Sequence, residues 1–198
     1  AFVEEALASL QQGDVLVAQL ESPLDAIARA LDAGRAAGAT TLLNPAPANV
    51  AIDSAMLDRA DILTPNETEF VARLGRHVGA RIEADAVCGI DQQRLHALCR
   101  DLTHGTVVVT LGSSGCFVSH AESNLRGDAT ACYRVPAETV RAVDTTGAGD
   151  AFNGALAASL ALKAERSFAE HVRFAVRYAS RSTELYGAAL AMPRMPVE

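Results

Sequence analysis

The hydrophobic positions along the chain alternate between short continuous apolar runs and longer stretches with helical spacing. Apolar runs rich in β-branched residues predict buried strands, and they occur at 15–20, 40–43, 61–64, 106–111, 116–119 and 132–136. Stretches in which apolar residues recur every three or four positions predict helices, at 2–11, 23–37, 54–59, 91–102, 151–162 and 168–185. This alternation predicts an α/β fold with three layers, in which helices cover both faces of a mostly parallel sheet.

Two places between and after these elements carry their own signals. Residues 120–131 are polar, and we expect a loop there. Gly187 follows the helical stretch at 168–185, and a glycine in that place is typical of the residue that ends a helix. We therefore expect Gly187 to end this helix.

The length and composition indicate one globular domain. A chain of 198 residues can bury roughly 70% of its unfolded surface, and 49% hydrophobic residues provide a core. The net charge of −7 is dispersed, which argues against nucleic acid or an anionic membrane as partner. No apolar run reaches membrane-spanning length and no signal peptide opens the chain, so we expect a soluble, cytoplasmic protein. The cysteines form no C-x-x-C pair and have no histidine at zinc spacing, which favours reduced thiols.

The stretch D-T-T-G-A-G-D-A-F-N-G at 144–154 carries the chemistry. Its small residues at 147–149 let the backbone turn tightly, and a helix follows, so N–H groups at a helix start form a ready site for an anion. Asp150 lies in the first helical turn, where a developing oxyanion or a phosphoryl group would be held. The pattern indicates phosphoryl transfer with Asp150 as base. The alternative is a plain strand-to-helix turn with a first-turn acid.

Two other common phosphate-binding motifs are excluded at this stretch. No G-K-[ST] follows the glycines, so the turn is not a Walker P-loop. Phe152 stands where a Rossmann G-x-G-x-x-G would require its last glycine.

Polar residues follow several of the predicted strands. Ligands of open parallel sheets bind beyond the carboxyl ends of the strands, so Glu21, after the strand at 15–20, is a candidate contact for a hydroxylated substrate. The alternative is a solvated loop acid. Asn66 and Glu69 follow the strand at 61–64 and face the same way, so they could reach a phosphate and hydrated Mg²⁺. Their alternative is a helix cap with an acid at its third position.

Two loops complete the set of candidate segments. N-P-A-P at 44–47 ends one strand in a rigid loop, and G-S-S-G at 112–115 turns another strand back on itself. Taken alone, each loop is consistent with a simple turn.

Taken together and in this order, Q-L-E-S-P, T-P-N-E-T-E, T-L-G-S-S-G and D-T-T-G-A-G-D resemble the motifs of the ribokinase family, the PfkB-type carbohydrate kinases. The resemblance runs almost from end to end and implies that residues 1–198 form one ribokinase-like α/β kinase domain. It implies ATP-dependent phosphorylation of a sugar, with the 5-hydroxyl of D-ribose as the first candidate. Another sugar or nucleoside is the alternative, and a homodimer is compatible with the resemblance.

The resemblance also implies roles in catalysis and sugar binding. Asp150 would take the proton from a sugar hydroxyl, and Glu21 and Asp150 would contact the sugar. The N–H groups of Gly147, Ala148 and Gly149 would stabilise the phosphoryl group during transfer.

Nucleotide and ion contacts are implied in the same way. The implied ATP-binding residues are Asn66, Thr110, Leu111, Gly112, Ser113, Ser114, Gly115 and Gly149. Glu69 would act on Mg²⁺ through water. A monovalent cation, K⁺, would be held by Asp144, Thr146, Ser182, Leu185 and Gly187.

The chain departs from the family pattern in three respects. The family's late hydroxyl ligand of the cation falls on Ala191, so we expect weaker potassium binding, and its polar adenine contact falls on Val176. The family's first strands, lid and several sugar contacts would precede Ala1, so we expect either a fragment or a shortened homologue with an exposed sheet edge. A shortened homologue that binds nucleotide without catalysis is therefore a second hypothesis.

Overall fold

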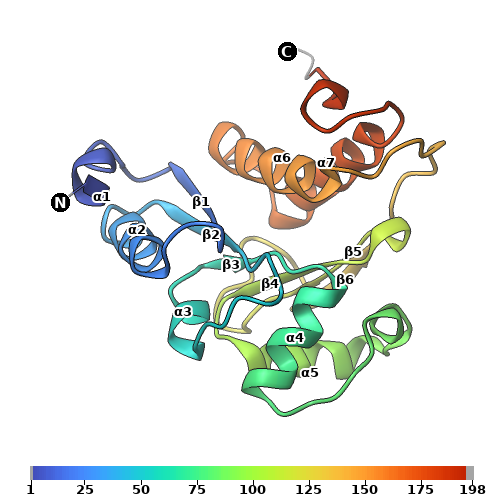
Figure 1. Cartoon of the computed structure of the whole chain (residues 1–198), viewed down its shortest axis with the longest axis horizontal. Helices are drawn as coiled ribbons and strands as arrows, with labels where there is room; N and C mark the ends of the chain where they lie inside the picture. The colour runs from blue at the N-terminus through green and yellow to red at the C-terminus, as the bar shows by residue number, and fades with distance from the viewer. Residues whose placement is uncertain (1, 195–198) are drawn as a thin grey trace.

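The computed structural model describes residues 2–194 and contains a six-stranded sheet whose strands lie in chain order (Figure 1). The first four strands run parallel, and the last two are antiparallel to their neighbours. The strands are β1 (Val15–Gln19), β2 (Thr40–Asn44), β3 (Ile62–Leu63), β4 (Thr106–Thr110), β5 (Cys116–Ser119) and β6 (Cys132–Val135). The predicted strands are therefore all present, with ends that differ by at most one residue.

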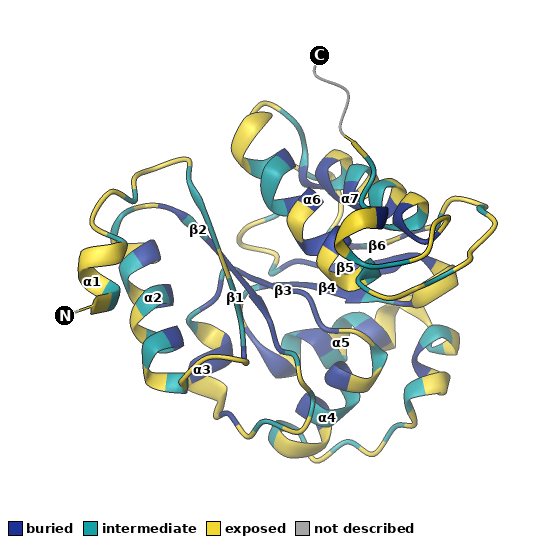
Figure 2. Cartoon of the chain, turned by 45° about the horizontal axis from the view of Figure 1, so that its top comes forward, coloured by how far each residue is buried: buried dark blue, intermediate teal, exposed yellow. Residues whose placement is uncertain are grey.

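Helices cover both faces of this sheet (Figures 1 and 2). The α-helices are α1 (Phe2–Ala6), α2 (Leu24–Ala36), α3 (Ser54–Asp58), α4 (Glu67–His77), α5 (Gln92–Leu102), α6 (Ala148–Leu162) and α7 (Phe168–Ser182). Short 3₁₀ turns are η1 (Ala84–Gly89), η2 (Gly112–Ser114) and η3 (Ala189–Ala191). Among the described residues, none of these helices combines the length and the apolar character that crossing a bilayer requires.

Two hydrophobic cores hold the three layers together. Val107 and Val109 of β4 pack with the helices α2 to α5, whereas Val108 between them packs with α6 and α7. In β2, Leu43 packs in the core with α2 to α5, and Leu42 packs in the core with α6 and α7. Because successive side chains of a strand point to opposite faces, a continuous apolar run supplies both cores at once. This arrangement confirms the predicted three-layer α/β fold.

Two helix ends differ from the sequence-based prediction. The first helix ends at Ala6 rather than near residue 11, and α7 ends at Ser182 rather than at 185. Thr183 is the C-cap of α7, so the expectation that Gly187 ends this helix is wrong. The carbonyl of Thr183 accepts hydrogen bonds from the backbone of Val143 and Asp144, at 2.7 and 3.1 Å. This tertiary contact holds the end of α7 against the segment that leads into α6.

Candidate active site

The turn before α6 has the tight geometry that its small residues predict. Gly147 is the N-cap of α6 and has a φ of 77°, in the left-handed region that favours glycine. A Cβ atom at this position would lie 3.0 Å from the Cβ of Ala188, so a side chain would also crowd the neighbouring loop. The turn therefore depends on glycine for both conformation and space.

The amides at this helix start are open to a ligand. The N–H of Ala148 donates to the carbonyl of Thr145 at 3.2 Å, whereas the N–H groups of Gly149 and Asp150 donate to no other residue in the described part of the chain. Gly149 is exposed, and a Cβ built on it would meet no atom within 4 Å. Since the first N–H groups of a helix lack partners within the helix, the N-terminus of α6 can bind an anion.

Asp150 is exposed in the first turn of α6, as predicted. Its Oδ1 accepts a hydrogen bond of 3.2 Å from Nε2 of Gln19, at the end of β1. The carboxylate thus lies beside the open amides and above the carboxyl end of the sheet. This juxtaposition of a base with an anion site is what a phosphoryl transfer requires.

The pair of Asn66 and Glu69 forms the capping box that was the alternative interpretation. Asn66 is the N-cap of α4, its Oδ1 accepts from the N–H of Glu69 at 2.8 Å, and Glu69 Oε2 accepts from the N–H of Asn66 at 2.9 Å. Glu69 Oε1 accepts from Nδ2 of Asn66 at 2.9 Å, and Oε2 also accepts from Nδ2 of Asn44 at 3.3 Å. Both carboxylate oxygens are therefore engaged within the protein.

Burial gives Glu69 an unusual electrostatic setting, because only 6% of the residue is exposed. Desolvation raises the pKa of its carboxyl, while the hydrogen bonds from Asn66 and Asn44 and the charge of Arg73 act in the opposite direction. A buried carboxylate with both oxygens occupied does not offer a direct bond to a metal ion. Glu69 can therefore contact Mg²⁺ only through a water molecule that the ion keeps in its hydration shell.

Arg73, which the sequence analysis did not single out, holds the N-P-A-P loop. The residue is 1% exposed, and its guanidinium donates to the carbonyls of Pro45 at 2.8 Å, Pro47 at 3.2 Å and Val50 at 2.6 Å. The peptide between Ala46 and Pro47 is cis. An arginine among the apolar residues of 70–74, together with a proline-rich loop that has few N–H groups, is the signal that could have revealed this role.

The loop between β4 and β5 lies beside Asn66. Thr110 and Asn66 form an isolated parallel bridge, which brings two of the predicted ATP-binding residues side by side. Leu111 N–H donates to the carbonyl of Gly115 at 2.8 Å, and Gly115 has a φ of 87°. A Cβ on Gly115 would lie 2.0 Å from the carbonyl oxygen of Val135, so only glycine fits. In contrast, Gly112, Ser113 and Ser114 are exposed.

Asp144 joins the segment before α6 to the segment after α7. Its Oδ1 accepts from the N–H of Thr146 at 2.9 Å, and its Oδ2 accepts from the N–H of Gly187 at 3.0 Å. Hydrogen bonds from Thr146, followed by the one from Gly187, lower the pKa of Asp144. The structure thus brings together three of the five residues that were predicted to hold a monovalent cation.

Comparison with known proteins decides the family. A family model described as pfkB family carbohydrate kinase matches residues 1–195. The chain belongs to the pfkB family.

Several relatives of this pfkB chain have the names of sugar kinases. Ribokinase from Haemophilus influenzae is 36% identical over 192 residues, which cover 96% of this chain and 56% of that protein. A deoxyribokinase from Salmonella typhi is 31% identical over 158 residues, which cover 78% of this chain and 45% of that protein. The structure of Arabidopsis thaliana ribokinase complexed with ribose and ATP matches with a TM-score of 0.71 and 27% identity, over 90% of this chain and 52% of that one. The chain thus spans about half the length of these relatives.

The other predicted site residues of this pfkB chain have fewer contacts. Glu21 is exposed in the turn after β1 and makes no hydrogen bond or ion pair with another described residue. Ser182 is buried, and its hydroxyl donates to the carbonyl of Ala179 at 2.8 Å, whereas Leu185 is 62% exposed. Their roles as sugar and cation contacts remain predictions.

The two departures from the pfkB pattern lie in buried places. Ala191 is buried in η3, and Val176 lines a cavity of about 750 Å³ between β6 and α7. Pro136, Glu138 and Arg177 border the same cavity. Val176 therefore adds an apolar wall where the resemblance implied a polar contact.

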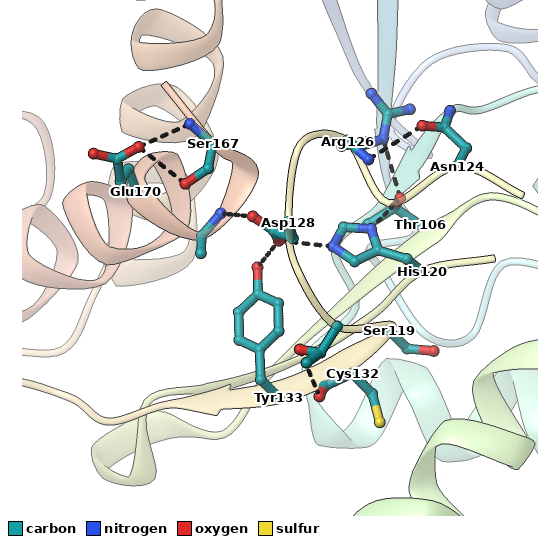
Figure 3. A network of polar contacts seen from close by, with 12 residues as sticks. Thr106, Ser119, His120, Asn124, Arg126, Asp128, Cys132, Tyr133, Ser167 and Glu170 are labelled. Atoms are coloured by element: carbon teal, nitrogen blue, oxygen red, sulfur yellow. Dashed lines mark hydrogen bonds and ion pairs between the residues drawn. The ribbon is translucent and has the colours of Figure 1, made fainter. Parts of the chain in front are cut away.

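A second polar cluster, which the sequence analysis missed, lies under the N-terminus of α7 (Figure 3). The carboxylate of Asp128 accepts hydrogen bonds from Nε2 of His120 at 3.0 Å, from the hydroxyl of Tyr133 and from the N–H of Ala169 at 2.8 Å. Nδ1 of His120 contacts the hydroxyl of Thr106 at 3.0 Å. The predicted loop at 120–131 is present, but it carries a buried network that ties β4, β6 and α7 together.

The partners of this network fix the protonation of His120. The carboxylate of Asp128 can only accept, so the proton of the neutral ring lies on Nε2 and points to Asp128. Nδ1 of His120 is then an acceptor and receives the hydroxyl hydrogen of Thr106, whose Oγ1 accepts from Nε of Arg126 at 3.0 Å. Burial lowers the pKa of His120, against the opposing pull of Asp128.

Proposed function

We propose that the protein containing this chain is an ATP-dependent sugar kinase, with D-ribose as the first candidate substrate and its 5-hydroxyl as the phosphoryl acceptor. The observation that carries the proposal is the open N-terminus of α6, where the exposed carboxylate of Asp150 stands beside the unpaired N–H groups of Gly149 and Asp150. Family membership and the relatives named above support the same assignment.

In this proposal Asp150 accepts the proton of the sugar hydroxyl as that oxygen attacks the γ-phosphorus of ATP. The bond from the γ-phosphorus to the β,γ-bridging oxygen breaks, and ADP leaves. The N–H groups of Gly147 and Gly149 would point at the phosphoryl group and stabilise its negative charge during transfer, whereas that of Ala148 would first have to leave the carbonyl of Thr145. A general base of this kind contributes roughly 10²–10⁴-fold to the rate.

ATP would lie along the exposed loop Gly112–Ser114 and next to Asn66, which meets Thr110 at the carboxyl end of β4. Mg²⁺, when bound, would neutralise phosphate charge, and Glu69 would reach it only through water because its two oxygens are already engaged. The loop around Asp144, Thr146 and Gly187 is where a potassium ion would bind next to the anion site. Ala191 offers no side-chain oxygen there, so potassium activation should be shallow.

The experiment is an assay of ADP formation by the natural full-length protein, with ATP and a panel of D-ribose, 2-deoxy-D-ribose, D-fructose and a nucleoside. The proposal expects the highest kcat/KM with D-ribose. Preference for 2-deoxyribose would move the assignment toward the deoxyribokinase that resembles this chain. Calorimetry that detects ATP binding without any sugar-dependent turnover would favour the nucleotide-binding alternative and overturn the kinase assignment.

A further inference from the structure

Gln19 contacts the carboxylate of Asp150, and the proposed reaction assigns Gln19 no role. It is the last residue of β1, and in the parallel register it pairs with Asn44, the last residue of β2. Leu16 and Ala18 of β1 pack with the core formed by α2 to α5, so the alternation along the strand directs Gln19 toward α6. Asn44 follows Leu42, which packs with α6 and α7, and therefore lies on the same face.

The orientation of the Gln19 amide follows from its neighbours. Nδ2 of Asn44 donates to the backbone carbonyl of Thr64 at 2.8 Å, and a carbonyl can only accept, so the amide of Asn44 cannot be flipped. Its Oδ1 is then an acceptor, and Nε2 of Gln19 must be the group that donates to it, at 3.0 Å. The second hydrogen of the same Nε2 points to Oδ1 of Asp150 at 3.2 Å. Gln19 therefore presents a donor, and not its carbonyl, to Asp150.

We infer that Gln19 is a positioning residue for the proposed base: its Nε2 holds the carboxylate of Asp150 in one orientation. This inference rests on the proposed function. Because Asn44 occupies the other hydrogen of Nε2, the donor is held in place rather than free to rotate.

The hydrogen bonds of Gln19 and Asn44 continue to Glu69, the residue predicted to act on Mg²⁺. Nδ2 of Asn44 also donates to Oε2 of Glu69 at 3.3 Å, so Asp150, Gln19, Asn44 and Glu69 form a continuous series of hydrogen bonds across β1, β2 and α4. The ionisable side chains in or next to this series are Asp150, Glu69, Arg73, whose charge acts on Glu69, and Glu21, which follows Gln19 by two residues. Gln19 thus couples the position of the base to the rigid start of α4.

The test replaces Gln19 with methionine, which keeps the length of the side chain and removes the donor, and with glutamate, which places a second carboxylate next to Asp150. Without the donor the carboxylate of Asp150 is no longer held in place, so kcat should fall about 3- to 10-fold in Gln19→Met, while the KM for ATP should stay within about twofold. The loss of kcat should be larger in Gln19→Glu, because the two carboxylates repel each other and Asp150 is pushed out of position.

The control is Val17→Ala on the same face of β1, since Val17 is 42% exposed and is no part of the site. It should lower the melting temperature slightly and leave kcat unchanged. A purely structural role of Gln19 would give the same result in Gln19→Met, so unchanged kcat in both Gln19 variants overturns the inference. Asp150→Asn tests the proposed base itself: if that variant keeps its turnover, the proposed base is wrong, whereas an inactive Asp150→Asn with fully active Gln19 variants rejects only the role of Gln19.

Discussion

Two aspartates of this chain, Asp150 and Asp128, occupy opposite kinds of environment. Asp150 is exposed at the start of α6, accepts one side-chain hydrogen bond and has unpaired amides beside it. The side chain of Asp128 is 3% exposed, and it accepts hydrogen bonds from His120, Tyr133 and Ala169. The carboxylate of Asp150 keeps lone pairs available for a ligand, whereas both oxygens of Asp128 accept hydrogen bonds from the protein.

This difference suits Asp150 to catalysis and Asp128 to holding the fold together. A carboxylate whose acceptors are all engaged cannot take a proton from a substrate without breaking the contacts that hold the fold. A carboxylate that accepts only one hydrogen bond can take a proton from a substrate without breaking the contacts of the fold. We therefore expect substitutions of Asp150 to affect turnover and substitutions of Asp128 to affect stability.

The largest effect should come from Asp150→Asn. The amide keeps the size of the side chain but cannot accept the proton, so kcat should fall by roughly 10²–10⁴-fold while the KM for ATP changes little. The free energy of unfolding should change by no more than about 0.3–1 kcal/mol, the usual value of a first-turn acid near a helix N-terminus. Steady-state kinetics and thermal unfolding of the full-length protein measure both quantities. Near-normal kcat with a lowered melting temperature would mean that Asp150 only caps the helix.

Asp128→Asn should show the converse pattern. The variant loses the charge that three donors share in a buried place, and we expect the free energy of unfolding to fall by about 3 kcal/mol. Urea unfolding measures this loss, and kcat at a temperature where the variant is folded should remain within about threefold. The matched control is Asp101→Asn, since Asp101 is an exposed acid of α5. If the two variants lose equal stability, the buried network does not hold α7 in place.

The smallest effect concerns pH. Burial lowers the pKa of His120 from its ordinary value of 6.5, even though Asp128 faces it; Arg126 and Arg100 act in the same direction as burial. As the pH falls, His120 therefore becomes protonated at a higher pH in the unfolded chain than in the folded chain. The stability contributed by neutral His120 is fully present above about pH 6.5 and is lost as the pH falls below that value, by at most about 1.4 kcal/mol per pH unit.

His120→Gln tests this sign. The variant should be less stable at every pH, but its free energy of unfolding should fall less steeply than that of the wild type between about pH 6.5 and 5. Burial also lowers the pKa of His77, His96 and His171, so part of the slope should remain. Urea titrations at several pH values give the slope, and parallel curves for the two proteins would contradict the assignment of a neutral, buried His120.

Local sequence was sufficient for the parts of the site that depend on neighbouring residues. The turn at 147–149 needs glycine at its left-handed position, and Asn66 and Glu69 lie three residues apart as a capping box requires. The apolar runs likewise predicted the strands, because a strand buried on two faces must be continuously apolar. Gly187 shows the limit of such signals: a glycine after a helical stretch indicated a helix end, but the contact of Thr183 with the segment before α6 decided where α7 stops.

The partners of the site were decided by tertiary structure. Gln19 and Asp150 are 131 positions apart, and Arg73 reaches carbonyls 23 to 28 positions away, so no periodicity connects them. His120 and Asp128 are only eight positions apart, yet their segment is polar and resembles an exposed loop until β4, β6 and α7 close around it. By itself, the sequence determined where the strands and most of the helices lie and where the anion-binding turn lies. The order of strands in the sheet decided which side chains meet, because burial and hydrogen-bond partners come from segments that are distant in the chain.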